Sequence, residues 1–113
     1  MYKYNAKVIS VYDGDSIRVN IDMGFSTWIL NKPLRLKGIN APEVRGQDRA
    51  AGIAARDALR ALILGEDIII HVSKRATHKG KYGRYIADIW CADSRQSVNN
   101  WLVQSGYAVR AVY

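Results

Sequence analysis

The sequence has a single cysteine, few acidic residues and no long apolar run. Cys91 cannot form an internal disulfide, and no Cys and His residues cluster at the spacing of a zinc finger or ribbon, so disulfide and zinc scaffolds are excluded. No apolar run approaches the roughly twenty residues that a membrane-spanning helix needs. Met1–Lys7 also lacks the hydrophobic stretch of a secretory signal. We therefore expect a soluble, cytoplasmic protein that does not bind a membrane.

Repeats, low-complexity segments and linkers rich in Pro, Gly or Ser are also absent. The 113 residues are therefore expected to form one domain over residues 1–113, which is large enough to bury a core without a structural metal. Seventeen Lys and Arg against ten Asp and Glu give a net charge of +7. This excess of positive charge favours a polyanionic partner such as nucleic acid, and we expect the protein to be a monomer.

The first forty residues have the pattern of β-strands. Four segments are rich in alternating apolar and polar side chains and predict strands: 7–11, 16–21, 25–30 and 34–39. Asp13-Gly14-Asp15 is a turn signal between the first two, which predicts a hairpin. Pro33 is expected to interrupt the pattern, and Pro42 to end it, because the residue before a proline is pushed into an extended conformation.

The rest of the chain alternates helical and extended patterns. Apolar residues recur at helical spacing over 47–64, and Gly65 supplies a left-handed stop. Segments 67–72 and 84–90 are rich in β-branched and aromatic residues. A second helix is predicted from the N-cap Ser97 to Gly106. The order β-β-β-α-β-β-α predicts an α+β fold, a small five-stranded antiparallel barrel of the OB type with two packed helices.

Two acidic residues flank the glycine of the first turn. In a twisted turn the carboxylates of Asp13 and Asp15 can approach one point, where a hard cation could bind. The alternative is that Asp-Gly-Asp is only a hairpin turn. Asn40, Ala41 and Glu43 follow the third extended stretch and could complete an oxygen-rich site. Taken alone, Glu43 is better explained as a solvated carboxylate or as a partner for the dipole of the following helix.

Basic residues occur in two places that could contact phosphate. Arg35 lies between two apolar strand residues, so its side chain points either into a cleft or into solvent. Segment 74–84 contains five Lys and Arg residues and no acid, together with glycines and Tyr82. Flexible, basic and aromatic residues together are suited to phosphate contact and base stacking. His71 and His78 have no partner at the spacing of metal ligands, and we interpret both as structural or solvated.

Three motifs follow one another along the chain: Asp13-Gly-Asp-Ser16, Leu34-Arg-Leu-Lys-Gly-Ile-Asn-Ala-Pro-Glu43 and Lys81-Tyr-Gly-Arg84. In this order and spacing they resemble the staphylococcal nuclease family, also called thermonuclease-like domains. The resemblance extends from about residue 7 to the C-terminus. It implies a five-stranded OB barrel and calcium-dependent cleavage of phosphodiester bonds in DNA and RNA, with products that end in a 3′-phosphate.

The resemblance also implies a role for individual residues. It assigns the metal carboxylate to Asp15, with Asp13 in support through water, and the other metal ligands to Asn40 and the backbone carbonyl of Ala41. The remaining roles fall on six residues: the base Glu43, the phosphate-binding Arg35 and Arg84, and the nucleotide-binding Lys81, Tyr82 and Tyr113. Such a set suits the reaction, because a cation and guanidinium groups can neutralise the charge that develops on the phosphoryl oxygens.

The sequence departs from the family in two ways. Asn40 stands where the family has an aspartate, so the site has one negative charge fewer but keeps an oxygen that calcium accepts. Longer members continue into a third helix, whereas this sequence ends at Tyr113.

From the motifs and the resemblance together, we predict a nuclease that binds single-stranded DNA or RNA. The alternatives are a nucleic-acid-binding OB module with weak or no catalysis and a protein-interaction module.

Overall fold

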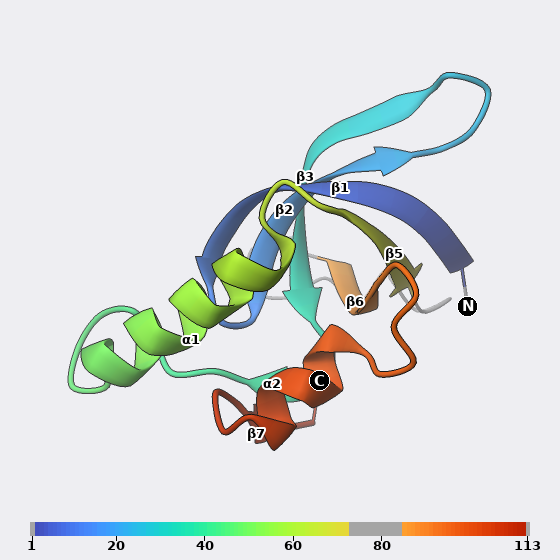
Figure 1. Ribbon diagram of the computed structural model, residues 1–113. Coiled ribbons are helices and arrows are strands. Elements are labelled where there is room, and N and C mark those ends of the chain that lie inside the picture. The colour runs from blue at the N-terminus through green and yellow to red at the C-terminus, as the bar shows by residue number, and fades with distance from the viewer. Residues whose placement is uncertain (1, 73–84, 113) are drawn as a thin grey trace.

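The computed structural model describes residues 2–72 and 85–112 (Figure 1). Five strands form a closed barrel in the order β1-β2-β3-β6-β5, and β4 pairs with β7 in a separate two-stranded sheet. The strands are β1 (Tyr2–Asp13), β2 (Ser16–Asp22), β3 (Trp28–Leu36), β4 (Ile39–Asn40), β5 (Asp67–Val72), β6 (Tyr85–Cys91) and β7 (Val109–Arg110), and the helices are α1 (Arg49–Ile63) and α2 (Val98–Gln104). The predicted α+β fold of the OB type is confirmed.

The core of the barrel follows from the alternation along each strand. In β2, Ile17, Val19 and Ile21 are buried, and in β5 the buried residues are Ile68, Ile70 and Val72. Because successive side chains point to opposite faces of a strand, one set fills the barrel and the other faces outward. The first two strands are joined as predicted, by the turn that contains Gly14.

The barrel differs from the prediction at β3. Its pairing with β6 is parallel, so the barrel is mixed rather than wholly antiparallel. Pro33 does not interrupt the strand but lies inside β3, opposite Arg18 of β2. A proline is tolerated there because it lacks only a backbone donor. Among the described residues the pairing of β3 with β6 begins at Leu34, one residue after Pro33, so the proline takes no part in that pairing.

Both helices end where the sequence indicated. Helix α1 buries Ala55, Leu59 and Ile63 against the barrel, and the left-handed Gly65 follows it with a φ of 77°. Helix α2 begins after Ser97, whose side chain accepts a hydrogen bond of 3.0 Å from the backbone N–H of Asn100. This is the geometry of an N-cap, which satisfies one of the free donors at the start of a helix. No helix among the described residues is long and apolar enough to cross a membrane.

Candidate active site

The candidate site begins at the turn between β1 and β2. Gly14 is buried in this turn, and a Cβ atom at this position would lie 2.7 Å from the Cβ of Ala41 and 2.9 Å from the Cβ of Ala55. Only a residue without a side chain allows the turn to pack this closely on the segment after β4 and on α1. The glycine therefore brings the two neighbouring carboxylates, Asp13 and Asp15, against the first residues after β4.

Asp15 is buried, with 6% of its surface exposed, and both of its carboxylate oxygens have partners. Its Oδ1 accepts a hydrogen bond of 3.2 Å from the hydroxyl of Ser16. Its Oδ2 accepts a hydrogen bond of 2.8 Å from the backbone N–H of Ala41 and lies 3.3 Å from Nη2 of Arg35. A buried charge is tolerated only when it is paired and hydrogen-bonded, and Asp15 meets both conditions.

Arg35 is also buried, which excludes the solvated alternative for this side chain. Its Nη1 donates hydrogen bonds to two backbone carbonyls, that of Leu36 at 3.1 Å and that of Asp15 at 3.5 Å. Its Nη2 makes the ion pair with Asp15 and donates a hydrogen bond of 3.2 Å to Oδ1 of Asn40. One nitrogen of the guanidinium is thus anchored on the backbone, and the other joins the two side chains that the sequence analysis assigned as metal ligands.

The oxygens around Nη2 are of the type that a hard cation binds. Oδ2 of Asp15 and Oδ1 of Asn40 lie 3.3 Å and 3.2 Å from the same nitrogen of Arg35, so both oxygens lie next to this cationic group. Calcium prefers carboxylate, amide and carbonyl oxygens, and this pair supplies the first two kinds. The pair brings one formal negative charge, and the described residues contain no group of three or more His, Cys, Asp or Glu suited to a metal. The oxygens are therefore of the kinds that calcium binds, but they carry little of the negative charge that strengthens calcium binding.

Asp13 supports the turn through its side chain. Its Oδ1 accepts a hydrogen bond of 3.1 Å from the backbone N–H of Asp15. The pKa of Asp13 is raised from 3.8 to about 6, mainly by burial and further by the neighbouring side chain of Asp15. Burial and a nearby like charge both disfavour the ionised form of a carboxyl. Asp13 and Asp15 are therefore unequal: the first is readily protonated, whereas the second is paired with Arg35.

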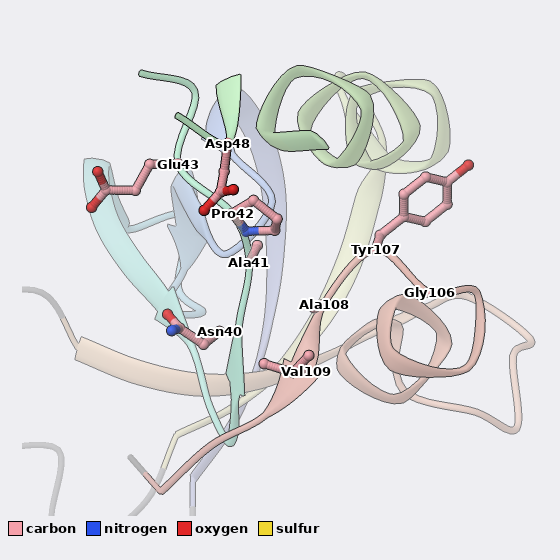
Figure 2. Close-up of a pocket in the computed structure, with 9 residues that line it drawn as sticks. All are labelled: Asn40, Ala41, Pro42, Glu43, Asp48, Gly106, Tyr107, Ala108 and Val109. Carbon is pink, nitrogen blue, oxygen red and sulfur yellow. The ribbon is translucent and has the colours of Figure 1, made fainter. Parts of the chain in front are cut away.

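Glu43 is exposed and lies at the rim of a pocket of about 360 Å³. Figure 2 shows the side chains of Asn40 and Glu43 extending to the same side of the segment that joins them, while Tyr107 extends on the other side of the pocket. The pocket is lined by Asn40, Ala41, Pro42, Glu43, Asp48, Gly106, Tyr107, Ala108 and Val109. The carboxylate of Glu43 is accordingly accessible to a ligand.

A glycine that the sequence analysis missed sets the position of Glu43. Gly52 is buried in α1, and a Cβ atom at this position would lie 1.9 Å from the backbone oxygen of Glu43. The backbone of Glu43 therefore rests directly on the helix. Glycine within a predicted helix costs about 1 kcal/mol relative to alanine, and this cost was the only signal in the sequence that could have pointed to a close approach.

Comparison with known proteins shows the family of the chain. The family model described as staphylococcal nuclease homologue matches residues 33–113. The chain belongs to this family. It is also 26% identical, over 126 aligned positions that cover 93% of this chain, to an uncharacterized protein of Methanocaldococcus jannaschii. The chain spans only 58% of the length of that relative.

The match to the nuclease homologue family begins inside β3 and therefore includes Arg35, Asn40 and Glu43. The turn with Asp13 and Asp15 precedes the matched residues. The turn belongs to the site because Asp15 forms an ion pair with Arg35, and the same guanidinium donates a hydrogen bond to Asn40. The structure thus joins the first motif of the sequence to the second.

Other predicted site residues are not brought to this point by the described part of the chain. Arg84, Lys81, Tyr82 and Tyr113 lie outside the described residues, as do His78 and the basic segment 74–84. His71 lies far along β5, where its ring stacks at 4.1 Å on that of Trp90. This contact agrees with the structural interpretation of His71.

Proposed function

We propose that this protein is a metal-dependent nuclease that uses calcium to hydrolyse phosphodiester bonds in DNA and RNA. Membership of the staphylococcal nuclease homologue family supports the reaction class. The observation that carries the proposal is the position of Nη2 of Arg35, within 3.3 Å of both Asp15 and Asn40. A phosphate-binding group and two calcium-type oxygens then act at the same point of the fold.

Three groups of this chain would hold the ion: the carboxylate of Asp15, the amide oxygen of Asn40 and the backbone carbonyl of Ala41. When bound, calcium supplies positive charge to a phosphoryl oxygen and so stabilises the negative charge of the transition state. The backbone N–H of Ala41 and the hydroxyl of Ser16 hold the carboxylate of Asp15 in place. Ligands that are fixed before binding need no reorganisation.

Arg35 would bind the phosphate of the substrate. Its Nη1 stays anchored on the carbonyls of Leu36 and Asp15, so the plane of the guanidinium is fixed. On substrate binding a phosphate oxygen would replace Asn40 as an acceptor of Nη2, and a charge-assisted hydrogen bond of this kind is stronger than a neutral one. We assign the second phosphate-binding role to Arg84, as the family resemblance implies.

Glu43 would act as the general base. It is exposed at the pocket rim, and its backbone is held against Gly52 of α1. A base needs access to water and a fixed position relative to the phosphate, and both conditions are compatible with this placement. The proton of the attacking water would pass to the carboxylate of Glu43 while the water oxygen forms a bond to phosphorus. The bond from phosphorus to the 5′ oxygen of the next nucleotide breaks, and this oxygen takes up a proton from solvent to leave as a hydroxyl. The product then ends in a 3′-phosphate.

Digestion of single-stranded DNA and RNA with calcium, with magnesium and with chelator tests the proposal. We expect cleavage with calcium, none with chelator, and at least a tenfold loss of kcat/KM in Glu43→Gln, which corresponds to about 1.4 kcal/mol of transition-state stabilisation. Glu66→Gln is the matched control, because Glu66 is an exposed glutamate that follows the C-terminal end of α1. Equal activity of wild type and Glu43→Gln would refute the role of Glu43.

One observation favours a second candidate, a nucleic-acid-binding module without turnover. Asn40 is neutral and Asp15 is already paired with Arg35, so little negative charge is left to attract a divalent ion. In that case single-stranded DNA should bind equally well with calcium and with chelator, and no cleavage should occur. The same digestion, combined with a binding measurement, therefore separates the two functions.

A further inference from the structure

The hairpin of β2 and β3 carries a group of exposed apolar side chains at its tip. These are Met23, Phe25, Trp28, Ile29 and Leu30. The segment 23–31 contains no charged residue, although the chain as a whole has a net charge of +7. Figure 1 shows that this hairpin stands out from the barrel. The tip is therefore an uncharged apolar projection on a basic protein.

This apolar tip, defined as residues 23–30, takes no part in the candidate active site. Strand β2 begins at Ser16, next to Asp15, and ends at Asp22, next to the tip. A strand of seven residues spans about 20 Å, because each residue adds about 3.3 Å. The tip and the site therefore lie at opposite ends of the same strand, and the tip needs an explanation of its own.

The backbone of the tip is unfavourable for its residues. The N–H of Thr27 donates a hydrogen bond of 2.9 Å to the carbonyl of Gly24, which closes a tight turn. The two central residues, Phe25 and Ser26, have φ values of 54° and 59°. Two successive left-handed residues define a type I′ turn, for which Asn-Gly is the preferred pair. A phenylalanine at this position is disfavoured by its backbone, and its side chain is fully exposed.

We propose that the apolar tip binds the same tip of a second copy of the chain, so that the protein forms a symmetric dimer rather than the monomer expected from the sequence. An exposed phenylalanine in a strained turn is explained when a partner covers it. Phe25 and the two side chains that share one face of β3, Trp28 and Leu30, together expose on the order of 450 Å², which is within the range of the largest apolar patch of a typical monomer.

The size of the patch sets the strength of the dimer. Two tips together would bury on the order of 1,000 Å², which is the lower limit for a specific interface, so the dimer is weak. Each tip meets the identical surface of the other copy, as a two-fold interface requires. Because the two active sites lie at the far ends of the hairpins, both stay open to substrate.

The absence of charge on the tip favours a second copy of the chain over nucleic acid as the binding partner. Surfaces that bind nucleic acid are rich in positive charge, and the segment 23–31 has none. For two copies that each have a charge of +7, contact through a neutral segment avoids bringing like charges together. A lipid surface would also accept apolar side chains, and it is therefore one outcome of the test.

Sedimentation of the protein from about 1 µM to about 1 mM, at moderate salt, tests the dimer. The test variant combines Phe25→Asn with Ser26→Gly, which places the preferred Asn-Gly pair in the turn. We expect the wild type to dimerise and the double variant to have a Kd at least tenfold higher. Its Tm should not fall, because the new turn relieves the backbone, and this separates lost dimerisation from misfolding. Leu64→Ser removes an exposed apolar side chain elsewhere and should leave the Kd unchanged.

Three results would overturn the proposal. The first is a wild type that stays monomeric over the whole range. The second is a double variant that dimerises as well as the wild type, since the interface would then lie elsewhere. The third is a monomeric wild type that floats with vesicles of phosphatidylcholine and phosphatidylserine while the double variant does not, which would assign the tip to a lipid surface. None of these outcomes depends on cleavage of nucleic acid, so the dimer and the proposed nuclease activity are tested separately.

Discussion

Replacing Asn40 with Asp would add a full negative charge at the point where the side chains of Asp15 and Arg35 meet. The new carboxylate has nearly the same size as the amide, so the geometry of the site is kept. The number of charged ligands is one of the main controls on calcium affinity. If Asp15 and Asn40 share an ion, one extra ligand charge should tighten calcium binding at least tenfold, or by about 1.4 kcal/mol.

Without metal, the effect depends on Arg35. The added carboxylate is repelled by Asp15, but Oδ1 of Asn40 lies only 3.2 Å from Nη2 of Arg35. Coulomb energy varies inversely with distance, so the attraction exceeds the repulsion as long as the two carboxylates are further apart than this. Asn40 is exposed, which screens both effects. We therefore expect the free energy of unfolding without metal to change by less than about 1 kcal/mol, and Tm by less than about 5 °C.

Calorimetric calcium titration, with thermal melts in calcium and in chelator, measures both effects. Asn31→Asp is the matched control, because the side chain of Asn31 also accepts a hydrogen bond from an arginine, Arg18, and lies nearer the other end of β3 from Arg35. The control should leave calcium affinity unchanged. An unchanged calcium affinity in Asn40→Asp would refute the metal site. A large fall of Tm in chelator would show that the attraction of Arg35 does not offset the repulsion between the two carboxylates.

Two further predictions concern the support of the site. Gly52→Ala should destabilise the fold by about 1–3 kcal/mol, because the new Cβ would collide with the backbone of Glu43. Alanine in place of glycine normally stabilises a helix, so the sign of the change in Tm is diagnostic. A gain in Tm in thermal melts would contradict the close approach. The raised pKa of Asp13 means that the folded state binds more protons than the unfolded state between pH 3.8 and about 6, so stability should fall as pH rises through this window. Asp13→Asn should abolish that fall and raise Tm at pH 7 in chelator, and identical pH profiles of the two proteins would exclude this role.

The sequence determined the elements of the fold. Strand β5 was predicted at 67–72 and is observed there, and α2 begins after Ser97 as expected. Alternation, helical spacing and capping depend on neighbours a few residues apart, so they can be recognised without knowledge of the fold. The sequence also indicated which residues belong to the site, because Asp15, Arg35 and Glu43 stand in motifs whose order and spacing resemble the staphylococcal nuclease family.

Only the tertiary structure decided how these residues meet. The ion pair of Arg35 with Asp15 and the hydrogen bond from Ala41 to Asp15 join residues that lie at least twenty positions apart. The tertiary structure also decided the role of Gly52, whose missing side chain makes room for the backbone of Glu43. Such contacts form because the barrel closes and α1 packs on it, and no local pattern specifies them. The sequence therefore supplied the groups, and the closure of the barrel set which charges are buried and paired.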